Sequence, residues 1–311
     1  MYSYVLKRLL SLIPVVIGVV FIVFSIMELT PSDPGTIKLG PLAPQSSIDQ
    51  INHELGYDRP FLQRFGDYLV NALQGDFGTS WVTGRPVFQD VFSRFPISLT
   101  LALFSVLTAV AFGLPIGMLS AVKQYSLGDY MSTVFALLMA AVPGFWLGLM
   151  LIVLFSLRLG WLPSFGIGSP AHFILPVVVL AIPNAAAIIR LSRTTMLETI
   201  RQDYIRTARA KGASEKTVIF KHALKNALLP VVTVIGIEFG VLLGSTVVVE
   251  AVFSMPGLGS LILSAINRKD VPQLMAAMIF LATLFTLVMV VVDIVYAFID
   301  PRIKARYARQ R

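Results

Sequence analysis

The chain alternates long apolar runs with shorter polar stretches over most of its length. The apolar runs occupy residues 9–29, 97–122, 130–157, 173–189, 228–252 and 274–299. A helix that crosses a bilayer needs about 20 apolar residues, and each run is close to that length or longer. The pattern therefore predicts an all-α polytopic membrane protein with six transmembrane helices.

The first apolar run follows Lys7 and Arg8, as the core of a signal peptide would. It is long for such a core, and no small-x-small cleavage site precedes Thr30 and Pro31. We therefore expect an uncleaved membrane anchor.

The 25 lysines and arginines lie mostly at the ends of the apolar runs and in one loop. Cytoplasmic loops of membrane proteins carry an excess of Lys and Arg. Placing both termini in the cytoplasm puts Lys7, Arg8, Lys123, the basic residues of 190–225 and those of 302–311 on that side. We therefore predict cytoplasmic termini. The net charge of +8 is then topological and does not indicate nucleic-acid binding.

The largest polar section, residues 30–96, follows the first apolar run. In this topology it lies on the periplasmic side of the membrane. Leu62, Phe65 and Leu69 have helical spacing. Prolines and glycines between residues 31 and 44 indicate irregular backbone before that helix. We predict a small folded subdomain, which either receives a delivery protein or merely covers the helix bundle.

A polar, basic segment from Arg206 to Pro230 separates two apolar stretches. Gly212 suits the left-handed conformation that ends a helix, and Ser214 suits the cap of the next one. Val218, Ile219 and Leu224 give the second helix an apolar face amid lysines. Composition alone fits an ordinary positive-inside loop, but the spacing predicts a helix, a tight turn and a second helix.

The basic segment reads Ala-Arg-Ala-Lys-Gly at 208–212, His-Ala-Leu at 222–224 and Leu-Pro at 229–230. This sequence resembles the EAA loop of ABC importer permeases, which forms the coupling helix that docks on the ATPase in that family. Thr207, Ala208 and Arg209 stand where the generic motif has Glu-Ala-Ala. The long interval from Gly212 to Pro230 resembles the dipeptide, oligopeptide and nickel branch of the family.

Shorter motifs extend the resemblance along the chain. They are Thr-Pro-Ser-Asp-Pro at 30–34, Leu-Gly-Tyr-Asp-Arg-Pro at 55–60, Gly-Asp-Phe-Gly at 75–78, Val-Glu-Ala-Val-Phe-Ser-Met-Pro-Gly-Leu-Gly at 249–259, and the stretch 293–302. Each motif is weak alone, but their order over nearly the whole chain is specific. The chain is most similar to permease subunits of the dipeptide type.

The resemblance implies a location in the bacterial inner membrane and a set of partners. These are a second homologous permease subunit, two ATPase subunits, a periplasmic or lipid-anchored substrate-binding protein and a peptide cargo, but no nucleic acid. ATP and Mg would bind the ATPase subunits, so no cofactor would bind this chain directly. The residues that the resemblance assigns to coupling are Ala208, Arg209, Lys211, Gly212, Ala213, Ser214 and Val218.

The sequence shows no assembled catalytic or metal site. His53, His172 and His222 are scattered, and neither H-E-x-x-H nor G-x-S-x-G occurs. Residues 212–217 end in Lys-Thr but lack the second glycine of a phosphate-binding loop. The absence of cysteine excludes disulfides and Cys-ligated metals. We therefore expect a transport subunit and not an enzyme.

Small residues and prolines recur within the apolar runs. Gly236, Gly240 and Gly244 follow one helix face and predict close approach of a neighbouring helix. The pairs Gly113 and Gly117, and Gly144 and Gly148, have the same spacing. Prolines interrupt several runs, where they either kink helices around a cavity or serve structure alone. These prolines are Pro115, Pro143, Pro176 and Pro183.

Glu238, Glu250 and Asp293 lie within the last two apolar runs, and a bare charge at membrane depth costs about 2.5–3.5 kcal/mol on insertion scales. Glu238 is the deepest of them. Its carboxyl group either meets a cargo ammonium in the translocation path or forms a hydrogen bond with a neighbouring helix. Glu250 and Asp293 lie near the interfaces, and we favour structural roles for both.

The outer loop 253–273 is unusually apolar. Pro256, Gly257, Leu258 and Gly259 favour a re-entrant or protruding hairpin that contacts the binding protein or gates cargo. A helix that lies on the lipid headgroups is the alternative.

These patterns divide the chain into three sections. Residues 1–29 form the N-terminal tail and first transmembrane helix, and residues 30–96 form the periplasmic subdomain. Residues 97–311 form a core of five helices with a coupling loop at about 191–227 and a C-terminal tail. We expect a permease subunit that forms half of the translocation path of an ATP-driven peptide importer. A self-contained secondary transporter or channel is the alternative, and the cargo stays open among dipeptides, longer peptides, glutathione and nickel complexes.

Overall fold

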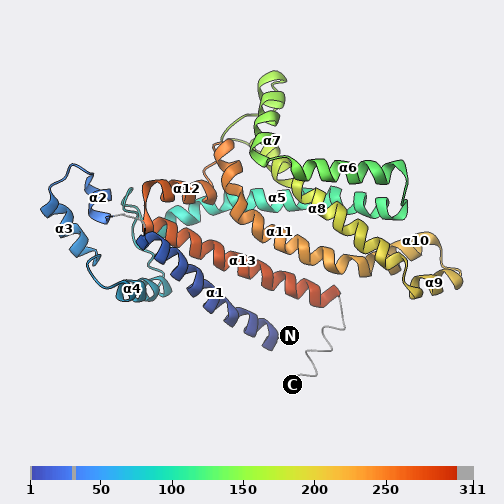
Figure 1. The fold of residues 1–311 in the computed structure, drawn as a ribbon, viewed down its shortest axis with the longest axis horizontal. Helices are drawn as coiled ribbons and strands as arrows, with labels where there is room; N and C mark the ends of the chain where they lie inside the picture. The colour runs from blue at the N-terminus through green and yellow to red at the C-terminus, as the bar shows by residue number, and fades with distance from the viewer. Residues whose placement is uncertain (1, 30–32, 300–311) are drawn as a thin grey trace. The chain divides into compact units, whose positions relative to one another are not determined.

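The computed structural model describes residues 2–29 and 33–299, which form helices and loops without a β-strand (Figure 1). The predicted all-α class is confirmed. The helices are α1 Tyr2–Leu29, α2 Pro34–Leu39, α3 Gln45–Glu54, α4 Phe61–Leu73, α5 Val87–Val122, α6 Leu127–Ala141, α7 Gly144–Leu151, α8 Ile174–Ile200, α9 Asp203–Ala210, α10 Glu215–Thr217, α11 Leu224–Val252, α12 Leu258–Arg268 and α13 Val271–Ile299, with short turns η1 Ile152–Arg158, η2 Pro170–Phe173 and η3 Val218–Ala223.

Several of these helices are long and apolar enough to cross a membrane. Among the described residues, four helices meet this criterion: Val87–Val122, Pro170–Ile200, Glu215–Val252 and Val271–Val292. Segments Leu127–Ala141 and Gly144–Arg158 form a fifth, broken span, and the shorter apolar helix Ile13–Leu29 lies where the first span is expected. The chain is therefore multi-pass, and the count of six stays a prediction. Cytoplasmic termini also stay a prediction.

The expected span 130–157 is not one straight helix. Its two halves, α6 and α7 with η1, are bent by 100° at a short break. Val142 is extended, with ψ of 124°, and Pro143 precedes α7. Proline lacks a backbone N–H and disfavours helical backbone in the residue before it. Hydrophobicity alone does not show such a bend.

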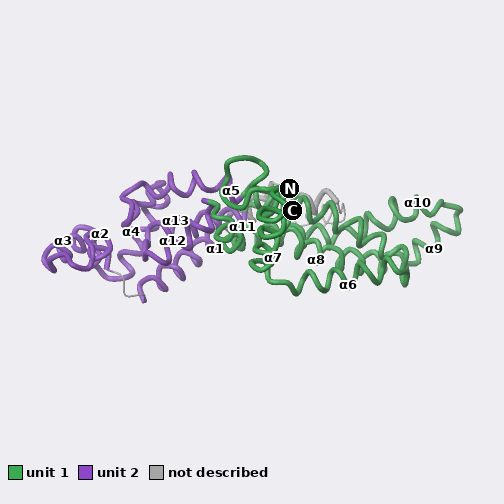
Figure 2. The backbone as a smooth tube through the Cα atoms, turned by 90° about the horizontal axis from the view of Figure 1, so that it is seen from above, with its two compact units in different colours: residues 1–7, 99–255, 287–311 green, residues 8–98, 256–286 purple. Residues whose placement is uncertain are grey.

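The described chain divides into two compact units (Figure 2). Unit 1 comprises residues 1–7, 99–255 and 287–311, and unit 2 comprises residues 8–98 and 256–286. The predicted subdomain 30–96 lies within unit 2.

In unit 1, α8 is the central helix and packs against α6, α7 and α11. It also meets α5 closely at two of the predicted glycines. A Cβ at Gly117 would lie 2.5 Å from the Ile189 carbonyl oxygen, and one at Gly113 would lie 3.0 Å from that of Ala185. These glycines let the α5 and α8 backbones approach, as their spacing predicts.

The glycine face of α11 is used in part. A Cβ at Gly236 would lie 2.1 Å from Cγ2 of Val292 on α13, so a close approach occurs there. A Cβ at Gly244 would meet nothing within 4 Å. The predicted close approach of a neighbouring helix therefore occurs at Gly236, and among the described residues it does not occur at Gly244.

Unit 2 has its own apolar core, in which α12 is embedded. Leu258 and Leu261 of α12 are buried with Val87 and Leu274. Asp270, between α12 and α13, accepts a hydrogen bond from the Ser80 hydroxyl and one of 3.0 Å from the Trp81 amide. The outer loop 253–273 thus forms a packed helix, where the sequence favoured a hairpin. The spacing of Leu258, Leu261, Ile262 and Ala265 explains this, because it is helical.

Candidate functional site

The basic segment forms the predicted helix–turn–helix. Helix α9 ends at a turn in which Gly212 has φ of +80° and donates a 2.9 Å hydrogen bond to the Arg209 carbonyl oxygen. Glycine adopts this left-handed backbone without steric cost. Ser214 then caps α10 by accepting a 3.4 Å hydrogen bond from the Thr217 amide. Both local predictions are confirmed.

The second helix of the segment continues directly into the membrane span. Helix α10, the π-helical turn η3 and α11 run without a break from Glu215 to Val252. Figure 1 shows α9 and α10 at one end of α8 and α11. Continuous helix therefore joins the turn after Gly212 to the membrane span.

An apolar cluster holds the segment against the bundle. Ile205 and Val218 are fully buried together with Met196 of α8 and Ala121 of α5. Ala208 and Ala213 are half-buried against the same cluster. Val218, which the resemblance assigns to coupling, thus anchors the segment and presents no surface to a partner.

The opposite face of the segment is exposed and basic. Arg209, Lys211, Gly212 and Ser214 are exposed. The Arg209 guanidinium pairs with Glu215 across the turn, with Nε–Oε1 at 2.7 Å and Nη2–Oε2 at 3.3 Å. The sequence analysis missed this ion pair, although a spacing of six residues across a predicted turn would have been a signal for it.

The sequence analysis also missed two exposed aromatic side chains near this turn. Tyr204 is 44% exposed and Phe220 is 51% exposed. Large apolar side chains on an otherwise polar surface are typical of anchors in protein interfaces. Tyr204 and Phe220, like the exposed cations of the segment, are therefore accessible to a partner.

A buried ion pair links three helices of unit 1. Asp129 at the start of α6 is 3% exposed and accepts a two-point bond from Arg193 of α8, at 2.6 and 2.9 Å. It also accepts hydrogen bonds from the Ser120 hydroxyl of α5 and from the Tyr125 amide. The sequence gave no local signal for this contact, because its two charges are 64 residues apart.

Glu238 lies half-buried on α11. Within the described part of the chain, its carboxylate accepts no hydrogen bond and forms no ion pair. Glu250 is fully buried near the end of the same helix, in keeping with the structural role expected for it. The Asp293 side chain lies outside the described residues.

The predicted gate residues fall into two groups. Pro256 is exposed, whereas Gly257, Leu258 and Gly259 are buried. The Leu258 amide donates a 2.8 Å hydrogen bond to the Ser98 hydroxyl. Only the first of the four residues therefore offers a surface to another protein.

Sequence profiles of two families match the chain. Residues 113–305 match the family described as binding-protein-dependent transport system inner membrane component, and residues 1–102 match the N-terminal region of such membrane components.

Relatives of known type match almost end to end. The glutathione transport system permease protein GsiC of Salmonella typhimurium strain LT2 is 42% identical over 304 residues, which cover 98% of this chain and 99% of the relative. GsiC of Escherichia coli strain K12 has the same identity and coverage.

Solved structures of transporters share the fold. The inward-facing MetNI methionine ABC transporter aligns with a TM-score of 0.57 and 20% identity, covering 70% of this chain and 99% of that one. An amino acid ABC transporter with histidines aligns with a TM-score of 0.52, covering 69% and 94%.

The family match excludes the alternative of a self-contained secondary transporter or channel, and it places ATP hydrolysis on separate subunits. Partner permease, ATPase and substrate-binding protein are implied in general by membership of such a system. The chain belongs to the binding-protein-dependent transport system inner membrane components, and it is the multi-pass inner-membrane permease subunit of an ABC importer.

Proposed function

We propose that this permease imports small peptides of the glutathione type. The observation that carries the proposal is the 42% identity to glutathione permeases over 98% of the chain. It would act with a second homologous permease, two ATPase subunits that hold ATP and Mg, and an outer substrate-binding protein. The chain itself would bind no cofactor.

The cargo is tested by uptake into vesicles that contain the assembled transporter and its binding protein. Radiolabelled glutathione, a dipeptide, a pentapeptide and a nickel complex are compared at equal concentration. We expect ATP-dependent uptake of glutathione or the dipeptide at least tenfold above the other two. Uptake of the nickel complex or the pentapeptide alone would contradict the proposal.

For coupling, we propose that the exposed face of α9, the turn and α10 docks on an ATPase. The face includes Arg209, Lys211, Gly212 and Ser214, with Ala208 and Ala213 supporting it. The apolar cluster around Ile205 attaches this face to α5 and α8. Movement of the ATPase would therefore be passed to three helices of the bundle at once.

We also propose that Pro256 lies at the contact with the outer binding protein, because it alone of the four predicted gate residues is exposed. The chain has no cysteine, so Pro256→Cys introduces a single thiol. Its labelling should fall when liganded binding protein is added, whereas Leu258→Cys, in a buried position, should label poorly throughout. Constant labelling at position 256 through the transport cycle would contradict the contact.

A further inference from the structure

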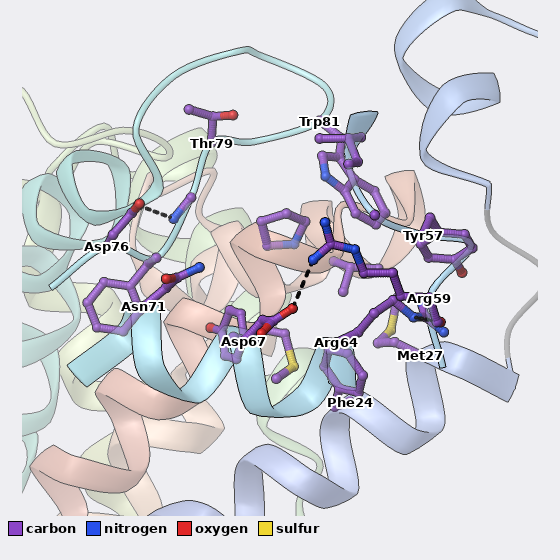
Figure 3. A pocket seen from close by; sticks show the side chains of 18 of the residues that line it. Phe24, Met27, Tyr57, Arg59, Arg64, Asp67, Asn71, Asp76, Thr79 and Trp81 are labelled. Atoms are coloured by element: carbon purple, nitrogen blue, oxygen red, sulfur yellow. Dashed lines mark hydrogen bonds and ion pairs between the residues drawn. The ribbon is translucent and has the colours of Figure 1, made fainter. Parts of the chain in front are cut away.

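Unit 2 contains a cavity of about 350 Å³ (Figure 3). It lies among the end of α1, the loop 55–59, helix α4, the loop 74–81 and the start of α13, all in the same unit. This volume is within the range of small-molecule sites, about 300–1,000 Å³. The wall combines aromatic rings with charged and amide side chains, which is the usual composition of a ligand site.

Several polar groups of the wall have unused hydrogen-bonding capacity. The Tyr68 hydroxyl is buried and has no hydrogen-bond partner among the described residues. Burial also raises the pKa of Tyr68, so this hydroxyl keeps its proton and stays a donor. The side-chain amide of Asn71 forms no hydrogen bond within the described chain. A buried hydroxyl without a partner is costly, so a ligand group that accepts a hydrogen bond from Tyr68 would remove that cost.

The charges of the wall lie on two sides. Figure 3 shows Asp76 and Asn71 on one side of the cavity and Arg59, Tyr57 and Trp81 on the other. Asp76 uses one carboxylate oxygen to accept a 2.9 Å hydrogen bond from the Gly78 amide, which leaves the second oxygen for another donor. The cavity therefore presents an acceptor side and a cationic side.

Arg59 and Arg64 are not equally accessible. Arg64 donates to the Arg59 carbonyl oxygen at 3.1 Å, pairs with Glu28 and lies 4.4 Å above the Tyr57 ring, and its side chain is only 12% exposed. It therefore serves as part of the wall. Arg59 forms one bond of 3.2 Å with Asp67, and both of these side chains are more than half exposed. A guanidinium has five donors, so Arg59 has several left for a ligand carboxylate.

We propose that this cavity binds a small zwitterion, an amino acid or dipeptide with an aromatic side chain. Its ammonium group bonds to Asp76 and to the side-chain oxygen of Asn71, and its carboxylate bonds to Arg59. An oxygen atom of the ligand accepts a hydrogen bond from the Tyr68 hydroxyl, and its side chain packs against Phe24, Tyr57 and Trp81. The ligand is of the same chemical class as the proposed cargo, so the inference deepens the proposed function. The site itself lies on unit 2 and is separate from Glu238.

Binding is measured on the full chain in lipid nanodiscs, without transport. The chain has three tryptophans, so Trp146→Phe and Trp161→Phe leave Trp81 as the reporter within the cavity wall. Titration with glycyl-phenylalanine should change Trp81 emission saturably. N-acetyl-glycyl-phenylalanine lacks the ammonium and glycyl-phenylalaninamide lacks the carboxylate, so each should bind at least tenfold more weakly. Equal binding of all three probes, or no saturable change, would overturn the proposal.

Two charge variants assign the groups. Asp76→Asn keeps the oxygen that accepts from Gly78 and removes the charge. It should therefore weaken the binding of glycyl-phenylalanine about tenfold and leave the binding of N-acetyl-glycyl-phenylalanine unchanged. Arg59→Gln should also weaken the binding of glycyl-phenylalanine about tenfold, and it should leave the binding of glycyl-phenylalaninamide unchanged. Asp49→Asn and Arg85→Gln make the same charge changes in unit 2 outside the cavity wall, and they should bind as the parent does. Equal losses in variants and controls would contradict the assignment.

Tyr68→Phe separates binding from folding. It removes a buried hydroxyl without a partner, so the empty protein should unfold at the same or a higher temperature, while glycyl-phenylalanine should bind several-fold more weakly. A hydroxyl that serves structure alone would produce no loss of affinity, and that result would remove Tyr68 from the site. Absence of peptide uptake in vesicles would overturn the proposed cargo and leave these binding results intact.

Discussion

Gly212 is the residue on which the turn of the basic segment depends. Its φ of +80° is a left-handed conformation, in which a residue with a Cβ costs about 1–2 kcal/mol. No atom lies within 4 Å of an added Cβ, so the cost is one of backbone strain and not of space. We predict that Gly212→Val displaces α10 and abolishes transport while the protein remains in the membrane, as measured by uptake and immunoblotting.

Gly212→Asn is the matched control, because asparagine tolerates left-handed backbone better than β-branched residues do. It should keep most of the transport activity. Equal activity of the Val and Asn variants would show that the conformation of this turn is unimportant for coupling.

Glu238 is half-buried and has no hydrogen-bond partner among the described residues, so its carboxyl group has unused capacity for a hydrogen bond or an ion pair. If its carboxylate meets a cargo ammonium, Glu238→Gln keeps size and hydrogen bonding and removes only the charge. We predict about a tenfold loss in uptake of peptides with a free amino end, which corresponds to about 1.4 kcal/mol. Uptake of the N-acetylated peptides should change little, and equal losses for both classes would indicate a packing role.

Residue-scale predictions succeeded where the chemistry is local. Gly212 and Ser214 follow from the backbone requirements of a helix end and a helix start, which neighbouring residues define. The pairing of Asp129 with Arg193 depends on how α6 and α8 pack, so neither residue is informative by itself.

At the scale of elements, the contact between α5 and α8 depends on Gly117. An added Cβ would lie 2.0 Å from the Ser192 Oγ and 2.5 Å from the Ile189 carbonyl oxygen, and backbone cannot move aside cheaply. Overpacking of this kind costs about 1–3 kcal/mol. We predict that Gly117→Ala lowers the apparent melting temperature in detergent by several degrees.

Gly244→Ala provides the control for this change. Gly244 also lies inside a long helix, but a Cβ there meets nothing within 4 Å. Its melting temperature should stay the same or rise, since alanine favours helix over glycine. A loss as large as that of Gly117→Ala would mean that the close approach of α5 and α8 is not the cause.

The ion pair of Asp129 and Arg193 joins α6 to α8, with Ser120 of α5 as a third partner. Removing one partner of a buried pair leaves an uncompensated charge and costs about 3–5 kcal/mol. We predict that Arg193→Met unfolds at markedly lower temperature than the parent, because Asp129 is 3% exposed.

The double variant Asp129→Leu, Arg193→Met removes both charges together. Replacing a whole buried pair by apolar residues is often close to neutral, so it should recover much of the lost stability. If the double variant is less stable than Arg193→Met, the two residues do not act as a pair.

Element-scale predictions show where hydrophobic pattern is sufficient and where it fails. Long apolar runs located α5, α8, α11 and α13 well, because length and composition suffice to identify a span. The same pattern did not reveal the 100° bend before α7, and it left α12 ambiguous between a hairpin and a helix. Both outcomes depend on which neighbouring elements satisfy the backbone and bury the apolar faces.

At the scale of the whole molecule, function was predictable because motifs are spread along nearly all of the chain, and the family match at 113–305 and 1–102 supports them. The cavity of unit 2 was not predictable in the same way. Its wall brings together residues from 24 to 275, which only the folded chain places side by side.

The proposed docking of the exposed basic face of α9 and α10 on an ATPase would depend on the charge of that face. Reversing an interfacial charge weakens association most at low salt, because the Debye length falls from about 30 Å at 0.01 M to about 3 Å at 1 M. We predict that Arg209→Glu weakens ATPase binding about tenfold at 0.01 M salt and much less at 1 M salt, as measured with the purified subunits.

Arg209→Glu also breaks the pair with Glu215 within the segment, so the double variant Arg209→Glu, Glu215→Arg is needed beside it. This variant keeps the net charge and the ion pair, with the two charges exchanged. If Arg209 touches the ATPase, the double variant should bind as weakly as the single one at low salt. Full recovery would mean that Arg209 only stabilises the turn through its pair with Glu215.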